Sequence, residues 1–198
     1  YDELLAIAQD QNRSGSSLLD LCVAVNERDN EAEVMQKLTS FLTERVEIPF
    51  CIDSTEPQVL AKAVRSNSGS VMINSINLEH NGKKAREILK LAVDFGCPVI
   101  ALTIDDDGMA KTLEKKCELA HALRDLACGE FGLPEHYLYI DPLVFTLATG
   151  ESDTADSALV SMEAIRRIKK EIPGIRTVMG VSNVSFGLKP KARRILNS

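Results

Sequence analysis

Short apolar runs alternate with helical patterns along the chain, and this alternation constrains the fold more than any other feature of the sequence. Strand-like runs are expected over residues 18–25, 48–53, 71–76, 98–104, 137–140 and 177–181. Helical patterns are expected over residues 1–13, 31–44, from 57, 83–95, within 109–131, 153–171 and 191–196. Nearly continuous apolar strands between helices are typical of a parallel sheet covered by helices. The sequence therefore predicts an α/β protein.

Two architectures fit this alternation. An open doubly wound sheet and a closed eight-stranded (β/α) barrel both place helices between parallel strands. A barrel typically needs about 250 residues, whereas this chain has 198, so a barrel would lack strands. No linker or low-complexity segment divides the sequence, which predicts a single domain over residues 1–198.

Polar side chains recur where the strands are expected to end. These residues are Asp20 within the first strand, then Asp53, Asn74 with Ser75, Asp105 to Asp107, Asp141, and Ser182 with Asn183. The carboxyl ends of parallel strands share one rim, so we expect several of these side chains to converge on one pocket. The residues expected to meet there are Asp53, Asn74, Asp141 and Asn183.

The chemistry of these side chains suits a polar heterocycle. Carboxylates only accept hydrogen bonds, whereas amides both donate and accept, as a fused ring with amino, ring N–H and carbonyl groups requires. No histidine stands at a strand end, so no metal site is predicted. Asp105 to Asp107 have an alternative role, because a carboxylate after a strand can also cap the next helix.

Charge and composition narrow the class of partner. The net charge of −6 argues against nucleic acid, and no apolar run approaches the roughly 20 residues of a membrane span. The five cysteines are scattered without Cys-x-x-Cys spacing, which favours reduced thiols and a cytoplasmic location. Neither a Gly-rich nucleotide-binding turn nor a phosphate-binding loop follows any strand.

Several motifs, taken together and in this order, resemble the pterin-binding methyltransferase family. The group includes the methyltetrahydrofolate-binding domain of cobalamin-dependent methionine synthase and the methyltetrahydrofolate:corrinoid protein methyltransferases. The matching segments are Ile52-Asp53-Ser54, Asn74-Ser75-Ile76, Asp141-Pro142 with Ala148-Thr149-Gly150, and Gly180-Val181-Ser182-Asn183-Val184-Ser185-Phe186. The resemblance implies a TIM-type (β/α) barrel similar to that of dihydropteroate synthase.

Two departures from the family pattern affect this interpretation. The family's first strand, with its Gly-Glu-Arg motif, and the strand after the final helix have no counterpart in the sequence. We therefore expect strands two to seven of the barrel, present as a fragment or closed by a partner. Cys22 also stands where methionine synthases often have Asn, which weakens the assignment of Asp20.

The resemblance implies a role for each candidate residue. Asp53, Asn74 and Asp141 would hydrogen-bond the amino group and ring nitrogens of the pterin. Asn183 would be catalytic and contact the nitrogen that carries the methyl group. Further predicted substrate contacts are Ser182, Asp20 and Asp105.

The resemblance also implies the reaction and its partners. The chain would bind 5-methyltetrahydrofolate and transfer its methyl group to the Co(I) corrinoid (cobalamin) of a partner protein or domain. A homodimer is a further expected assembly. The alternatives are a dihydropteroate synthase-like pterin enzyme and a non-catalytic folate-binding barrel fragment.

Overall fold

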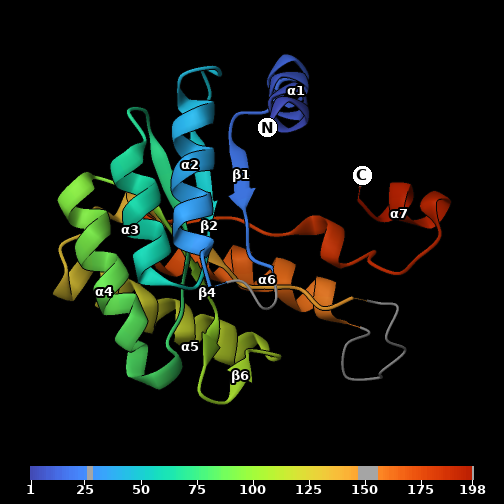
Figure 1. Cartoon of the computed structure of the whole chain (residues 1–198). Coiled ribbons are helices and arrows are strands. Elements are labelled where there is room, and N and C mark those ends of the chain that lie inside the picture. Colours follow the sequence, from blue (N-terminus) through green and yellow to red (C-terminus); the bar gives the residue numbers. More distant parts are fainter. Residues whose placement is uncertain (26–28, 147–155, 198) are drawn as a thin grey trace. The chain divides into compact units, whose positions relative to one another are not determined.

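The computed structural model describes residues 1–25, 29–146 and 156–197 (Figure 1). Its helices are α1 (Asp2–Arg13), α2 (Glu31–Thr43), α3 (Pro57–Ser66), α4 (Glu79–Phe95), α5 (Leu113–Arg124), α6 (Ser157–Glu171) and α7 (Pro190–Leu196). Its strands are β1 (Leu19–Cys22), β2 (Phe50–Asp53), β3 (Val71–Ile76), β4 (Val99–Leu102), β5 (Ile104–Asp105), β6 (Gly108–Met109), β7 (Leu138–Asp141) and β8 (Arg176–Thr177). The predicted alternation of strands and helices is confirmed.

Six of these strands form one sheet, in the order β1-β2-β3-β4-β7-β8. The pairs β1–β2, β2–β3 and β7–β8 are parallel. Strands β5 and β6 form a separate antiparallel hairpin. The six predicted strands are therefore present, and the hairpin was not predicted.

The chain divides into two compact units. The first comprises Tyr1–Ile76 and Lys84–Val99, and the second comprises Asn77–Lys83 and Ile100–Ser198. The first unit contains β1, β2 and β3, whereas the second contains β7, β8 and the helices from α5 onward. One domain over residues 1–198 stays a prediction.

In the first unit the helices cover the strands with apolar stripes of helical spacing. Helix α2 buries Met35, Leu38 and Leu42, which stand at i, i+3 and i+7 and so share one face. Helix α3 begins at Pro57, where proline suits the first helical position. The two helices lie side by side in Figure 1, and β2 contributes the buried side chain of Phe50.

Two strands differ from their predicted form. Strand β1 covers only four residues, with Leu19 and Leu21 buried while Asp20 and Cys22 are exposed. This alternation places the leucines on one face of the strand and the polar pair on the other. Strand β8 has only two residues, because the chain turns into a 3₁₀ helix over Val181–Asn183 soon after it.

The start of α4 departs from helical geometry. His80, Asn81 and Gly82 have positive φ angles of 51°, 55° and 68°. The regular helix follows this kink, which agrees with the predicted start at residue 83. Gly96 ends the helix at a φ of +65°, the left-handed conformation that glycine adopts without steric cost.

Over the described residues, none of the helices combines the length and the apolar character needed to cross a bilayer.

Candidate functional site

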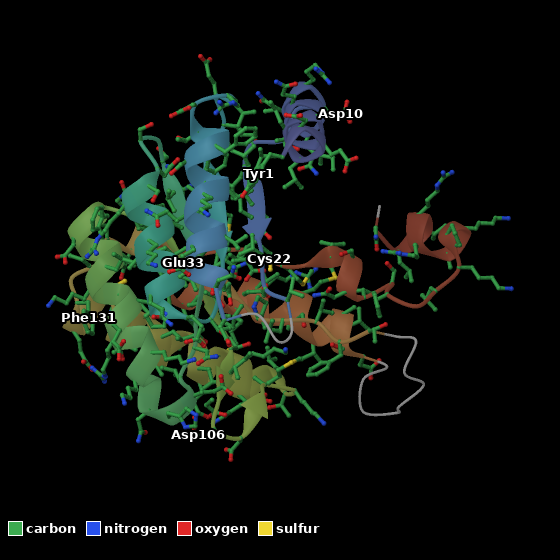
Figure 2. All side chains as sticks on the ribbon, in the orientation of Figure 1. Tyr1, Asp10, Cys22, Glu33, Asp106 and Phe131 are labelled. Carbon is green, nitrogen blue, oxygen red and sulfur yellow. The ribbon has the colours of Figure 1, made fainter. Side chains whose placement is uncertain are left out.

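In the first unit, the predicted polar residues lie on one face of neighbouring strands. Strand register places Asp20 opposite Cys51, Cys22 opposite Asp53, and Asp53 opposite Asn74. Residues that face each other in register, and residues two apart along a strand, point to the same side of a sheet. Strand register therefore places Asp20, Asp53 and Asn74 on the same side of the sheet, with the thiols of Cys22 and Cys51 beside them. Cys22 lies at the end of β1 (Figure 2).

The carboxyl groups and thiols of this group lie close enough to shift one another's pKa. Burial raises the pKa of Asp53, the nearby charge of Asp20 raises it further, and a hydrogen bond from Cys22 opposes the rise. Burial also raises the pKa of the Cys22 and Cys51 thiols, and the two aspartates add to both shifts. Both cysteines therefore stay protonated at neutral pH and act as weak S–H donors toward the carboxylates.

The loop after β2 is tied to the end of β3 by Ser54. The backbone N–H of Ser54 donates to the Asn74 carbonyl at 2.9 Å. Its Oγ donates to Oε1 of Glu31 on α2 at 2.8 Å and accepts from the N–H of Glu56 at 3.2 Å. Ser54 is buried, so these bonds hold the neighbouring Asp53 in a defined place.

In the second unit, Asp141 ends β7 as predicted and shapes the turn that follows. Its Oδ1 accepts from the N–H of Leu143 at 2.7 Å, and its carbonyl accepts from the N–H of Thr103 at 3.1 Å. Leu143 has a φ of 59°, an uncommon angle for a branched side chain. Burial raises the pKa of Asp141, while the Leu143 N–H and the Lys116 ammonium partly lower it.

Lys116 was missed by sequence reasoning. Its side chain on α5 is 0% exposed, and its Nζ donates to the carbonyls of Pro142 at 2.5 Å and Leu143 at 3.2 Å. Burial lowers its pKa to about 8, and the charge of Asp141 opposes that shift. A signal was present, because Lys116 shares the buried stripe of α5 with Leu119, Ala120 and Leu123.

Asn183 lies at the end of the 3₁₀ helix after β8, with an exposed side chain. Ser182 beside it is also exposed. A Cβ added at Gly180 would lie 2.8 Å from Nδ2 of Asn183, so a larger residue at position 180 would displace the amide from its present place. Ser185 is fully buried and its Oγ donates to the Ser182 carbonyl at 3.2 Å, which ties the turn together.

Asp105 is engaged in local contacts. Its Oδ2 lies 2.8 Å from Nζ of Lys115, and its Oδ1 accepts from the N–H of Asp107 at 3.0 Å. The hydrogen bond from Lys115 is the main reason that the pKa of Asp105 is lowered. Thr112 caps α5 instead of an aspartate, with its Oγ1 accepting from Lys115 N–H at 3.2 Å. A substrate-binding role for Asp105 stays a prediction.

The candidate residues thus form two groups, one in each unit. Asp20, Asp53 and Asn74 share one side of the sheet in the first unit, whereas in the second unit Asp141 ends β7, and Ser182 and Asn183 follow β8. Convergence of all of them on one pocket stays a prediction. The segment Ala148-Thr149-Gly150, part of the matching motifs, lies outside the described residues.

The whole chain, residues 1–198, matches the family model described as pterin binding enzyme. It is 42% identical over 201 residues to the methionine synthase of Mycobacterium tuberculosis, covering 100% of this chain and 17% of that protein. The methionine synthase of Mycobacterium leprae is 40% identical over the same length and is also covered to 17%. The chain therefore spans less than a fifth of these relatives.

Solved structures of dihydropteroate synthases share the fold. The enzyme from Xanthomonas albilineans in complex with 7,8-dihydropteroate matches with a TM-score of 0.72 at 18% identity, over 98% of this chain and 71% of that one. The Thermus thermophilus enzyme in complex with 6HMPPP matches with a TM-score of 0.67 at 15% identity, over 100% of this chain and 76% of that one. The predicted TIM-type barrel fold is confirmed by these matches.

Proposed function

Because the chain belongs to the pterin-binding enzyme family, we propose that it binds 5-methyltetrahydrofolate and transfers the methyl group to a corrinoid. The corrinoid would be carried by another domain or a partner protein. The chain covers 17% of the methionine synthase relatives, which leaves most of their length for other domains. Its free cysteines favour action in a reducing compartment such as the cytoplasm.

The observation that carries this proposal is the 42% identity to a methionine synthase along the full chain. The dihydropteroate synthase structures are only 15–18% identical over a similar span and therefore support the fold alone. Methyl transfer from a folate is accordingly favoured over the joining of a pterin to p-aminobenzoate.

The strand-end residues have the hydrogen-bonding character that a pterin needs. Asp53 and Asp141 are half-buried acceptors, suited to the amino and ring N–H groups of the pterin. Asn74 can accept from one group and donate to another. Hydrogen bonds to a charged acceptor are about twice as strong as neutral ones, so the two carboxylates would dominate affinity. Further proposed contacts are Ser182, Asp20 and Asp105.

The chemical difficulty of the reaction lies in the leaving group. The C–N bond to the methyl group breaks, its electron pair stays on the pterin nitrogen, and that nitrogen takes a proton from solvent. The corrinoid supplies the electron pair for the new bond to the methyl group. An exposed amide such as Asn183 can strengthen its hydrogen bond to the nitrogen as charge changes there, which stabilises the transition state more than the ground state.

Two measurements test the proposal in sequence. Calorimetric titration with 5-methyltetrahydrofolate should show saturable binding at one site per chain. Addition of Co(I) cobalamin should then give a change in the visible spectrum that requires both the protein and the folate. Binding without transfer would favour a non-catalytic folate-binding domain. Product formation from a dihydropterin pyrophosphate and p-aminobenzoate would instead favour the synthase reaction.

A further inference from the structure

Lys116 is the buried cation of the second unit whose contacts converge on the turn after β7. Its ammonium donates to the carbonyls of Pro142 and Leu143, the two residues that follow Asp141. Its Nζ also lies 5.8 Å from the centre of the Phe145 ring, within the range of a cation–π contact. These three contacts of the Lys116 ammonium thus belong to one short segment, residues 142–145.

The same turn is anchored from α6 by neutral side chains. Ser161 Oγ donates to the Leu143 carbonyl at 2.6 Å, and Ser157 Oγ accepts from the Phe145 N–H at 2.8 Å. A hydroxyl can therefore satisfy a carbonyl in this turn without the desolvation penalty of a buried cation. Holding the backbone alone does not explain why a lysine occupies this position.

What a cation adds at this turn is an electric field at the carboxylate of Asp141, the residue that precedes Pro142 and Leu143. Asp141 is the charged group that acts on Lys116, and Lys116 is the charged group that acts on Asp141. A positive charge beside a half-buried carboxylate favours its ionised form. Only the ionised form is a pure acceptor for N–H donors.

We propose that Lys116 is a positioning residue for Asp141: it holds the turn after β7 in place and keeps the Asp141 carboxylate ionised for pterin recognition. This inference rests on the proposed function, because it assumes that Asp141 accepts hydrogen bonds from the pterin. Lys116 itself is fully buried and acts through Asp141.

The first test needs no ligand. Methionine fills similar space to lysine but carries no charge, so the pKa of Asp141 should rise by about one unit in the Lys116→Met variant. NMR of the ¹³C-labelled carboxyl carbon of Asp141 measures this pKa. Lys170→Met removes an exposed charge from α6 and should leave that pKa unchanged. An equal pKa in Lys116→Met and the unaltered protein would overturn the inference.

A second measurement uses the unaltered protein, in case the variant does not fold. Because the pKa of Lys116 lies at about 8, the Asp141 carboxyl signal should show two steps, its own titration and a smaller one near pH 8. A single step across a pH range in which the Lys116 ammonium itself titrates would mean that the two groups do not interact, and would overturn the inference.

The third test asks whether the interaction between Lys116 and Asp141 affects folate binding. The affinity of Lys116→Met for 5-methyltetrahydrofolate should fall by up to about tenfold at acidic pH and recover as the pH rises, because Asp141 then ionises without the help of Lys116. Loss of affinity by the same factor at every pH would indicate a structural role only and contradict the inference. If the unaltered protein does not bind the folate, the proposed function is overturned. The NMR experiments would still decide whether Lys116 affects the pKa of Asp141.

Discussion

Asp53 in the first unit and Asp141 in the second are the same residue type at the same kind of position, the end of a parallel strand, yet their surroundings differ. Burial raises the pKa of both. Asp20 adds a second negative charge near Asp53, whereas Lys116 supplies a positive charge near Asp141. The end of a strand thus fixes the position of a carboxylate, while the charged groups around it determine its pKa.

The two units also hold their polar groups differently. Asp20, Asp53 and Asn74 stand on regular strands, where register alone aligns them. Asp141 and Asn183 depend on turns whose shape comes from side-chain contacts and from the close approach at Gly180. We expect the first group to contribute to the affinity for the pterin, and the second group to contribute both to this affinity and to the rate of methyl transfer.

The largest effect should come from comparing two asparagines, one in each unit. We predict that Asn183→Ala lowers the rate of methyl transfer by about ten- to a thousandfold with a smaller loss of pterin affinity, because its bond strengthens in the transition state. Asn74→Ala should mainly weaken binding. Single-turnover kinetics and calorimetry separate the two effects, with the exposed Asn197→Ala as control. Unchanged transfer in Asn183→Ala would remove its assigned role.

Changing each carboxylate to an amide should weaken folate binding by about ten- to a hundredfold at neutral pH, because a charged acceptor is lost. Asp53→Asn and Asp141→Asn are the matched pair, measured by calorimetry. Because both pKa values are raised, binding by the unaltered protein should weaken as pH falls, beginning above the ordinary range of an aspartate. Equal affinity of either variant and the unaltered protein would contradict the corresponding contact.

A smaller effect is expected from Gly180→Ala. The added Cβ would meet Nδ2 of Asn183 at 2.8 Å, and the amide can move aside, so we expect transfer to fall about tenfold while thermal stability hardly changes. Gly129→Ala, where a Cβ meets nothing within 4 Å, is the matched control. Full activity in Gly180→Ala would show that the placement of the Asn183 amide tolerates this shift.

The smallest effect concerns stability in the first unit. Because the pKa of Asp53 is raised on folding, the folded state holds this proton more tightly than the unfolded chain, and stability falls as pH rises through the folded pKa. Asp53→Asn should therefore raise the midpoint of thermal unfolding by a few degrees at pH 7. The gain should vanish below the ordinary aspartate pKa, where Asp53 is protonated in both states. A lower midpoint at pH 7 would contradict the sign of this shift.

The sequence predicted the parts of the structure that depend on local pattern. Strand β3 occupies its predicted residues 71–76, and Asp53 and Asp141 end their strands as expected, because apolar runs and flanking turns are local signals. Asn74 lies within β3, two residues before its end. Asp53 and Asn74 lie opposite each other because β2 and β3 are neighbouring parallel strands.

Features that depend on distant contacts were not predicted. Lys116 lies 26 residues from the Pro142 carbonyl that it contacts, so nothing near it in the sequence indicates its partner. The β5–β6 hairpin was not predicted, because the carboxylates of Asp105 to Asp107 suggested a helix cap. In the structure Asp105 and Gly108, which has a φ of +96°, form the turn of this hairpin. Strand β8 ended early because Gly180 and Ser185 shape a turn where the apolar pattern indicated a strand.

The order of the strands in the sheet follows their order in the chain, from β1 to β8 with only the small hairpin set aside. Among the described strands of this sheet, each from β2 onward therefore pairs with the sheet strand made just before it. Contacts between neighbours in sequence limit the entropy lost on closing each loop. We expect this sheet to grow strand by strand as the chain leaves the ribosome, with each exposed edge covered by the next arrival.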